Sequence, residues 1–412
     1  MARILDVYLA NKYAGKLNQD EAGELSFTYD DAYVQSGGLA ISLSLPVNLA
    51  HHTGIAVKAY FSGLLPDETI RERLAAYLGL SEQNTFSLLE AVGGDCAGAL
   101  ALYPEGQTPA EETNDIETLD HQALTEILAL IEQRPMLAGE DGLRLSLAGA
   151  QRKLAVGFDG TNIQLIKGGA PTTHILKPII DRFEDTAHNE LFAMRLADMV
   201  GITAPKAQIY YVGDKPYYLV ERYDRVTNGQ GQVTRVHQED FCQALAIPPD
   251  MKYEREGGPN LAQSMDLIKQ RSIRPAVDAL RFLDLVIFNF LIGNADAHGK
   301  NFSFLYRQGK PELAPAYDLL STAIYPALSD KMAMKIGGKY KPREVYPRHF
   351  YKIVPNTKAA ETAMQRQINT MAEKMTRQAE VLKDSLSKES AASPIFNDIQ
   401  DVIVQRAKNV IE

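Results

Sequence analysis

The last third of the chain carries two acids and an amide with the spacing of a phosphoryl-transfer site. Asp296 precedes Asn301 by five positions in the string GNADAHGKNFSF at 293–304. At this spacing an Asp accepts the proton of an attacking hydroxyl group and an Asn holds a magnesium ion. Asp318 follows 17 residues after Asn301, which leaves room for a β-hairpin at 302–310 before a second metal-binding acid. Asp and Asn are also common turn residues, so this interpretation needs support from the rest of the chain.

A lysine and a glutamate earlier in the chain have the types needed to bind phosphate in such a site. Lys177 stands at the end of the apolar string THILKP at 173–178, which is typical of a strand. Glu190 lies 13 residues later on a predicted helix that could bring it back to this strand. The alternative is an exposed lysine with a surface glutamate. The order of strand lysine, helix glutamate, catalytic acid, amide and metal-binding acid favours phosphoryl transfer.

A phosphate-binding loop is predicted at 145–154, in the string LSLAGAQRKL. Its small residues let backbone amides approach phosphate oxygens, and Lys153 adds a positive charge. The chain has no G-x-G-x-x-G motif between strands and no G-K motif followed by Ser or Thr, which excludes a conventional P-loop NTPase. The alternative is an ordinary tight turn.

The segment 218–225 suits a hinge between two lobes, because an apolar strand there ends in polar residues. We expect its backbone to read the edge of an adenine ring while apolar neighbours cover the two faces. The alternative is a simple strand end with a surface ion pair.

Periodicity places a β-rich part at the start of the chain. Alternating apolar residues predict antiparallel strands within 3–45, and apolar residues every fourth position predict a helix from 66 to 79. A polar, acidic segment at 104–120 indicates a soft boundary before a helix that carries Leu124 and Leu128.

The middle of the chain predicts one sheet and the end predicts helices. The strands of this sheet are expected at 143–158, 163–166, 174–177, 207–212 and 217–220, with a helix at 186–200 between them. Beyond 221 the pattern is mostly helical and includes helices at 277–291 and 356–387. We therefore expect three parts, at 1–110, 111–220 and 221–412, with a ligand in the cleft between two lobes.

Composition limits the compartment and the partners. The 43 basic and 52 acidic residues among 412 give a net charge of -9, so nucleic acid would be met only through a local patch or a basic partner. Only Cys96 and Cys242 are present, without a C-x-x-C motif, which excludes a disulfide framework and a thiolate zinc site. No run of 18 apolar residues occurs, and Asp6 interrupts the start, so we expect a cytoplasmic protein with no membrane partner.

The chain resembles the HipA family of toxin serine/threonine kinases over nearly its whole length. The strings that carry the resemblance occur in the family's order: SLAGAQRKLA at 146–155, THILKP at 173–178, HNELFAMRLA at 188–197, LVERYDR at 219–225, HQEDFCQAL at 237–245, GNADAHGKNFSF at 293–304 and APAYDLLST at 314–322. The resemblance implies a bilobal, protein-kinase-like α+β fold with a β-rich N-terminal part and a helical C-terminal lobe.

The resemblance also implies the site and its cofactors, ATP and Mg2+. Asp296 would be the catalytic base, Asn301 and Asp318 would bind the metal, and Lys177 would contact the phosphates and pair with Glu190. The remaining residues expected to bind ATP are Ala148, Gly149, Ala150, Gln151, Arg152, Lys153, Glu221, Arg222, Tyr223, His298, Gly299, Lys300 and Tyr317, besides Asn301 and Asp318.

The resemblance implies regulation and partners as well. Ser146 matches the family's autophosphorylated serine, whose modification ejects the phosphate loop and inactivates the kinase. A charge of about -1.5 to -2 on phosphoserine would repel the phosphates of ATP. The family pairs with a helix-turn-helix, HipB-like antitoxin dimer that binds operator DNA, and its best-known substrate class is an aminoacyl-tRNA synthetase, particularly the glutamyl enzyme.

Two rival interpretations remain open. The Asp-x-His loop at Asp296 also resembles lipid kinases, so a small-molecule or lipid kinase is one alternative. The other is a catalytically idle, nucleotide-binding co-repressor. It is favoured by the segment 331–358, where eight basic residues stand against a single acid, Glu344. This basic segment could meet DNA or an acidic substrate, or be a solvated face.

Overall fold

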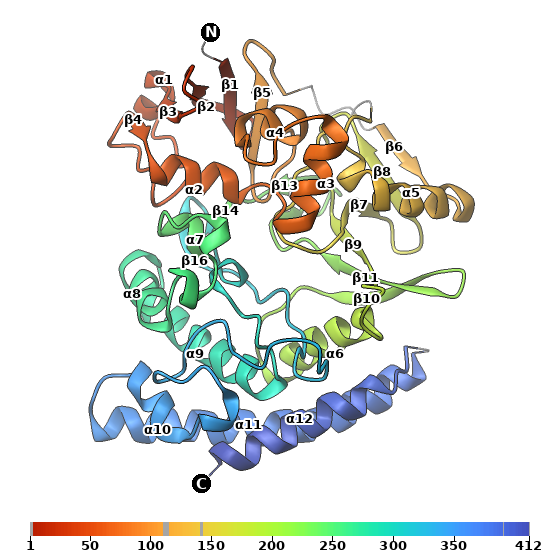
Figure 1. Cartoon of the computed structure of the whole chain (residues 1–412), viewed down its shortest axis with the longest axis vertical. Coiled ribbons are helices and arrows are strands. Elements are labelled where there is room, and N and C mark those ends of the chain that lie inside the picture. Colours follow the sequence, from red (N-terminus) through yellow and green to blue (C-terminus); the bar gives the residue numbers. More distant parts are fainter. Residues whose placement is uncertain (1–2, 110–114, 141–142, 390, 412) are drawn as a thin grey trace.

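The computed structural model describes residues 3–109, 115–140, 143–389 and 391–411. The described chain forms an α+β fold in which the β-rich parts come first and the helices last (Figure 1). The predicted α+β class is confirmed. Among the described residues no helix has both the length and the apolar character needed to cross a membrane.

The fold opens with an N-terminal unit, residues 3–104, built on an antiparallel sheet in the order β4-β3-β2-β1-β5. Its strands are β1 (Arg3–Leu9), β2 (Lys12–Gln19), β3 (Leu25–Tyr29), β4 (His51–Thr53) and β5 (Leu100–Pro104), and its helices are α1 (Asp31–Gln35), α2 (Ile55–Gly63), α3 (Glu68–Leu78) and α4 (Thr85–Val92). Helix α3 confirms the helix predicted from 66 to 79. The prediction of strands as far as residue 45 is wrong, because Asp30 accepts a hydrogen bond from the backbone N–H of Tyr33 and starts helix α1.

A second antiparallel sheet follows in the order β10-β11-β9-β7-β8-β6. Its strands are β6 (Asp115–Thr118), β7 (Leu154–Phe158), β8 (Ile163–Lys167), β9 (His174–Pro178), β10 (Ala207–Val212) and β11 (Lys215–Glu221). Two helices belong to this part, α5 (His121–Gln133) and α6 (Thr186–Val200). Helix α6 has the predicted limits, and Gly201 ends it in the left-handed conformation at φ 99°.

The strand predicted at 143–158 forms only in its last five residues, as β7 (Leu154–Phe158). Before this strand the backbone bonds to the N-terminal unit instead of the sheet. The N–H of Asp95 donates to the carbonyl of Arg144 (2.7 Å), and the N–H of Ser146 donates to the carbonyl of Asp95 (3.0 Å). The alternating pattern therefore reflects burial against the N-terminal unit.

The acidic segment 104–120 is partly structured. Its residues 115–118 form β6, which pairs with β8 at the edge of the second sheet. Residues 110–114 of the predicted boundary lie outside the described residues.

The last part of the chain is mainly helical. Its helices are α7 (Phe241–Ala244), α8 (Leu261–Arg271), α9 (Pro275–Ile292), α10 (Pro347–Phe350), α11 (Lys358–Lys388) and α12 (Ile395–Val410). Helices α9 and α11 confirm those predicted at 277–291 and 356–387. Helix α9 ends at Gly293, where φ is 91° and an added Cβ would lie 2.8 Å from Cβ of Ala323. In Figure 1, α11 and α12 lie side by side below α9.

Short elements complete the chain. The hairpin of β15 (Ser303–Arg307) and β16 (Lys310–Leu313) lies where the sequence predicts one, and β14 (Gln238–Asp240) pairs with β15. Strands β12 (Arg225–Thr227) and β13 (Val233–Arg235) form a separate pair. The 3-10 helices are Pro135–Leu137, Pro249–Met251, Glu254–Glu256, Gly299–Asn301, Pro342–Glu344 and Tyr351–Ile353.

Two apolar cores meet at the second sheet. Leu176 and Leu219 from this sheet are buried in one cluster with Leu5 of the N-terminal unit. Tyr218 and Val220 face the other cluster, which contains α6 and the C-terminal helices. The sheet is therefore a shared layer between the two ends of the chain, and the division at 110 and 220 stays a prediction.

Candidate active site

A cavity of about 1170 Å³ is lined by the second sheet, the helical part and the N-terminal unit. It collects the predicted residues of segments 148–153, 221–223 and 296–318, together with Lys177 and Glu190. Two predicted residues do not line it. Gly299 packs so closely that an added Cβ would lie 2.7 Å from Sγ of Cys242, and Ser146 is fully buried beside the cavity.

Lys177 stands between two acids. Its Nζ lies 2.6 Å from Oε1 of Glu190 and 3.0 Å from Oδ1 of Asp318. The side chains of Lys177 and Glu190 are each 7% exposed, unlike the exposed pair of the alternative interpretation. Burial disfavours the ammonium charge, but Glu190 and then Asp318 outweigh burial and raise the pKa of Lys177. The ion pair between Glu190 on α6 and Lys177 on β9 thus keeps a cation at the wall of the cavity.

Asn301 and Asp318 offer oxygens that suit a divalent cation. Nδ2 of Asn301 donates to Oδ2 of Asp318 (3.0 Å), while the buried Oδ1 of Asn301 has no hydrogen-bond partner. Asp318 has a φ of 57°, which is uncommon for a residue other than glycine and is typical of functional sites. Within the described residues no group of three His, Cys, Asp or Glu side chains is placed to hold a metal. This donor set fits magnesium, which commonly binds one or two carboxylates together with phosphate oxygens.

Asp296 is held by a residue that the sequence did not reveal. The hydroxyl of Tyr253 donates to Oδ1 of Asp296 (2.6 Å), and the N–H of Asp296 donates to Oδ1 of Asn294 (3.0 Å). Burial raises the pKa of Asp296 to about 6, although Tyr253 and Lys252 oppose this effect. A carboxyl group with this pKa is ionised near neutral pH and suits a general base.

The predicted phosphate loop bends tightly around its own lysine. Gly149 has a φ of 107°, a backbone conformation in which a residue with a side chain is strained, so this position favours glycine. Nζ of Lys153 donates to the carbonyl of Ala148 (2.6 Å), and burial lowers the pKa of this lysine to about 8. Arg152 pairs with Asp181 and Glu132 at the outer side of the loop.

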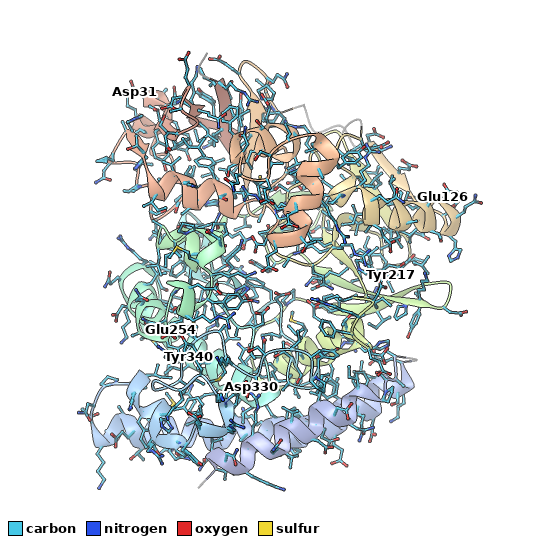
Figure 2. All side chains as sticks on the ribbon, in the orientation of Figure 1. Asp31, Glu126, Tyr217, Glu254, Asp330 and Tyr340 are labelled. Carbon is cyan, nitrogen blue, oxygen red and sulfur yellow. The ribbon has the colours of Figure 1, made fainter. Side chains whose placement is uncertain are left out.

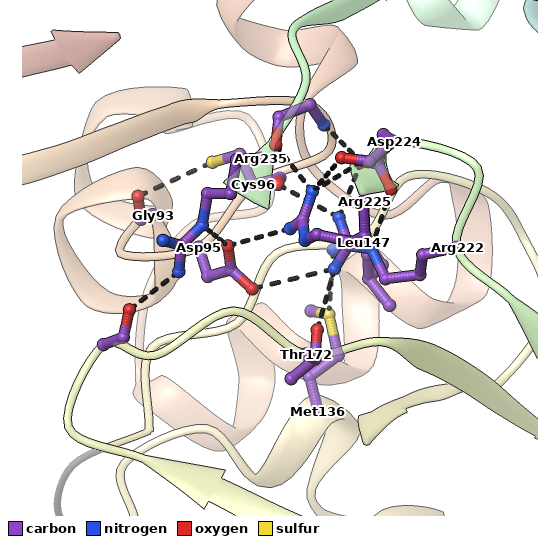
Figure 3. Close-up of polar contacts among 12 residues, drawn as sticks. Gly93, Asp95, Cys96, Met136, Leu147, Thr172, Arg222, Asp224, Arg225 and Arg235 are labelled. Atoms are coloured by element: carbon purple, nitrogen blue, oxygen red, sulfur yellow. Dashed lines mark hydrogen bonds and ion pairs between the residues drawn. The ribbon is translucent and has the colours of Figure 1, made fainter. Parts of the chain in front are cut away.

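The predicted hinge is anchored by a buried ionic network (Figure 3). Arg222 donates to Oδ2 of Asp224 (2.8 Å) and to Oγ1 of Thr172 (3.0 Å). Asp95 from the N-terminal unit accepts hydrogen bonds from Arg225 (3.1 Å) and Arg235 (2.9 Å). The ion pairs at this strand end are therefore buried, not on the surface, and they tie the hinge to the N-terminal unit.

An aromatic pair lies next to this hinge. The rings of Tyr223 and Tyr317 stack with centroids 5.3 Å apart, and the hydroxyl of Tyr317 donates to the carbonyl of Lys300 (2.6 Å). Hinge and catalytic loop are thus in contact through two side chains that line the cavity.

Lys300 points to an acid of the N-terminal unit. Its Nζ lies 2.7 Å from Oδ1 of Asp67, and both side chains are buried. Lys252 lies beside them, 3.7 Å from Asp67 and 2.7 Å from Glu68. Sequence reasoning missed Asp67, Lys252 and Tyr253, because no local motif links them to the catalytic loop.

Some of the basic residues in segment 331–358 form ion pairs with acids. Lys335 pairs with Glu254 (3.4 Å) and lies over the ring of Tyr340, and Figure 2 shows Glu254 and Tyr340 close together. Lys339 pairs with Glu344 (3.3 Å). Lys331 lines the cavity. The segment therefore adjoins the candidate site.

Family comparisons cover most of the chain. Residues 5–103 match the family described as HipA N-terminal domain, and residues 145–381 match the HipA-like C-terminal domain. The serine/threonine-protein kinase toxin HipA of Shewanella oneidensis is 31% identical over 357 residues, which cover 83% of this chain and 80% of that protein. Y4mE of Sinorhizobium fredii, named as a candidate kinase, is 41% identical over 414 residues, which cover 99% of this chain and 98% of that protein.

A solved structure agrees over the whole fold. The toxin–antitoxin complex of HipA, HipB and operator DNA from Shewanella oneidensis MR-1 contains a chain that matches with a TM-score of 0.84 at 26% identity. The match covers 98% of this chain and 97% of that one. The bilobal, kinase-like fold expected from the resemblance is confirmed.

Proposed function

Because the chain belongs to the HipA family of toxin kinases, we propose that it transfers the γ-phosphoryl group of ATP to the hydroxyl group of a protein serine or threonine. The observation that carries this proposal is the meeting of Lys177, Asp296, Asn301 and Asp318 in one cavity. Lys177 stands more than 100 positions before the other three residues, and together the four supply a base, a cation and metal-binding oxygens.

In the proposed reaction, ATP lies with its phosphates along the loop 148–153 and Lys177, and with its base against the hinge at 221–223. Asp296 accepts the proton of the acceptor hydroxyl while its oxygen bonds to the γ-phosphorus. The bond from this phosphorus to the β–γ bridging oxygen breaks, and ADP leaves with that electron pair. Bound magnesium, held by Asp318 and Asn301, would neutralise charge on the β- and γ-phosphates.

We further propose that Ser146 is the site of self-inactivation. Its hydroxyl donates to the carbonyl of Leu64 (2.8 Å), and the side chain is fully buried. A phosphate group cannot be accommodated there without moving the chain, and its charge would repel bound ATP. Phosphorylation would therefore displace the loop that begins at Leu147.

The proposed partners are a HipB-like, helix-turn-helix antitoxin dimer and, mainly through it, operator DNA. The support is the structural relative, which was solved as a complex of HipA, HipB and operator DNA. The antitoxin would neutralise the toxin, and the two would repress their own operon together. The basic segment 331–358 is the surface that we propose for contact with phosphates, and the proposed protein substrate is an aminoacyl-tRNA synthetase, such as the glutamyl enzyme.

The test is incubation of the purified, unphosphorylated protein with labelled ATP and magnesium, followed by mapping of labelled peptides. We expect label on Ser146 in the wild type and none in Asp296→Asn. Asp284→Asn is a matched control, because Asp284 lies on α9, accepts a hydrogen bond from Gln367 and does not line the cavity. Equal labelling in Asp296→Asn would contradict the assignment of the base.

The alternative of an idle co-repressor gives a different result in the same experiment. It requires ATP binding without any transfer of label, together with salt-dependent binding of operator DNA in the presence of the antitoxin. Label on a lipid or a metabolite, and none on protein, would support the small-molecule or lipid kinase.

A further inference from the structure

Asp67 lies where the N-terminal unit meets the two loops of the candidate site. It directly precedes helix α3 and is buried, with 7% of its surface exposed. Its carboxylate does not cap the helix. The side chain instead points to Lys300 and Lys252. The backbone of the same residue contacts the phosphate loop.

The backbone contact is with Gly149. Pro66 and Gly149 form an isolated parallel bridge, and the N–H of Asp67 donates to the carbonyl of Gly149 (3.2 Å). The same strand-like segment also accepts the hydroxyl of Ser146, through the carbonyl of Leu64. Residues 64–67 therefore run along the phosphate loop and hold it at two points.

The side-chain contact is with the catalytic loop. Oδ1 of Asp67 lies 2.7 Å from Nζ of Lys300, which directly precedes Asn301. Oδ2 lies 3.7 Å from Nζ of Lys252, whose carbonyl accepts the N–H of Gly299 (3.2 Å). The buried carboxylate of Asp67 thus lies between two buried lysines, and Glu68 supplies a second acid to Lys252.

The backbone next to this carboxylate is strained. Glu68 has a φ of 49°, although it is not a glycine and begins a helix. Left-handed conformations of such residues persist only where surrounding contacts hold them, and here Lys252 binds the carboxylate of Glu68 (2.7 Å). The local contacts thus maintain a conformation that an isolated helix start would not adopt.

We infer that Asp67 is a positioning residue for phosphoryl transfer, because it links the phosphate loop to the catalytic loop through the N-terminal unit. The link between the two loops is independent of the proposed function, and only its effect on catalysis rests on that function. The phosphate loop sets the place of the γ-phosphate, and the catalytic loop sets the place of Asp296. Their relative position therefore depends on a residue that touches neither the acceptor nor the reacting atoms.

The test compares Asp67→Asn with a matched control, Asp278→Asn. Asp278 is also fully buried, and it pairs with Arg281 (3.0 Å) and accepts the N–H of Leu313 (2.9 Å), but it does not line the cavity. Hydrogen exchange of residues 146–153 is measured in the protein without nucleotide, and the affinity for a non-hydrolysable ATP analogue is measured with magnesium. We expect Asp67→Asn to speed exchange in this segment and to weaken the analogue on the order of tenfold, with both values near wild type in Asp278→Asn.

A second variant keeps the inference testable if Asp67→Asn folds poorly. Lys300→Met removes the cation on the other side, and the double variant reports whether the two side chains act as a pair. We expect the analogue affinity of the double variant to match that of the weaker single variant. Additive losses, unchanged loop exchange, or equal effects in Asp278→Asn would overturn the inference.

These measurements do not need phosphoryl transfer. If the wild-type protein binds the analogue but transfers no phosphate, the proposed function is contradicted. Hydrogen exchange of residues 146–153 would still decide whether Asp67 links the phosphate loop to the catalytic loop. If transfer occurs, Asp67→Asn should raise KM for ATP and lower kcat, whereas Asp278→Asn should change neither by more than about twofold.

Discussion

The hydroxyl of Tyr253 lies 2.6 Å from Oδ1 of Asp296 and donates a hydrogen bond to it. The ring of the same tyrosine contacts His298 edge-on, with centroids 5.2 Å apart. Tyr253 therefore fixes one oxygen of the proposed base and leaves the other for an acceptor hydroxyl. This arrangement orients the carboxylate and favours its ionised form.

The pH dependence of transfer should report this contact. Burial raises the pKa of Asp296 from its ordinary 3.8 to about 6, and only the ionised form can accept a proton. We expect kcat/KM to fall as the pH drops through about 6. Tyr253→Phe removes a donor to the carboxylate, which is worth about 1.5–3 kcal/mol in such bonds, so the acidic limb should move to higher pH.

The control for this experiment is Tyr346→Phe, since Tyr346 is 42% exposed and does not line the cavity. Its pH profile should coincide with that of the wild type. An acidic limb in Tyr253→Phe that stays at the wild-type pH would show that the tyrosine does not influence the base.

Removal of the Lys177 cation should abolish most transfer. Lys177→Met keeps a side chain of similar length but removes the charge that faces the phosphates, and we expect kcat to fall by about 10²–10³-fold. Lys167→Met is a matched control, because Lys167 stands on β8 of the same sheet and pairs with Glu117 at the surface (2.8 Å). Steady-state kinetics at saturating ATP check the prediction, and a similar loss in both variants would contradict it.

Asp318→Asn should change the magnesium dependence. The substitution removes a negative charge beside Asn301 while it keeps the shape of the side chain, so a divalent cation loses its main anionic protein ligand. We expect the magnesium concentration for half-maximal transfer to rise on the order of tenfold or more. A magnesium titration of both proteins measures this, and an unchanged midpoint would place the metal elsewhere.

The ionic network at the hinge should contribute to stability. Asp224 accepts hydrogen bonds from Arg222 and from the N–H of Gly98 (2.7 Å), and it is 3% exposed. Asp224→Asn leaves two buried guanidinium groups short of a counter-charge, which typically lowers the free energy of unfolding by about 3–5 kcal/mol. Urea denaturation measures the change. Lys16→Ala, which removes an exposed pair with Glu105, should leave the free energy of unfolding close to that of the wild type.

Local patterns account for the parts of the site that the sequence could predict. Helix α6 has the predicted limits because its apolar period and Gly201 are both visible in the sequence. The hairpin between Asn301 and Asp318 follows from two short strands around a turn at Gly309. In each case neighbours in the sequence determine the structure.

Long-range contacts account for what the sequence missed. Asp67 meets Lys300 across 233 positions, and Tyr253 meets Asp296 across 43. Neither pair leaves a periodic or spacing signal in one chain. The strand predicted at 143–158 is wrong over residues 143–153 for the same reason: the backbone there bonds to Asp95, and its alternating leucines are buried in the cluster of the N-terminal unit.

The shared core at the second sheet has a consequence for how the chain can be divided. Leu176 and Leu219 are buried in the same apolar cluster as Leu5 and Val7 of the N-terminal unit. A cut that separated the first hundred residues would expose one face of the sheet that carries Lys177 on its central strand, β9. We therefore expect a chain that lacks the first hundred residues to lose stability in the sheet that carries Lys177.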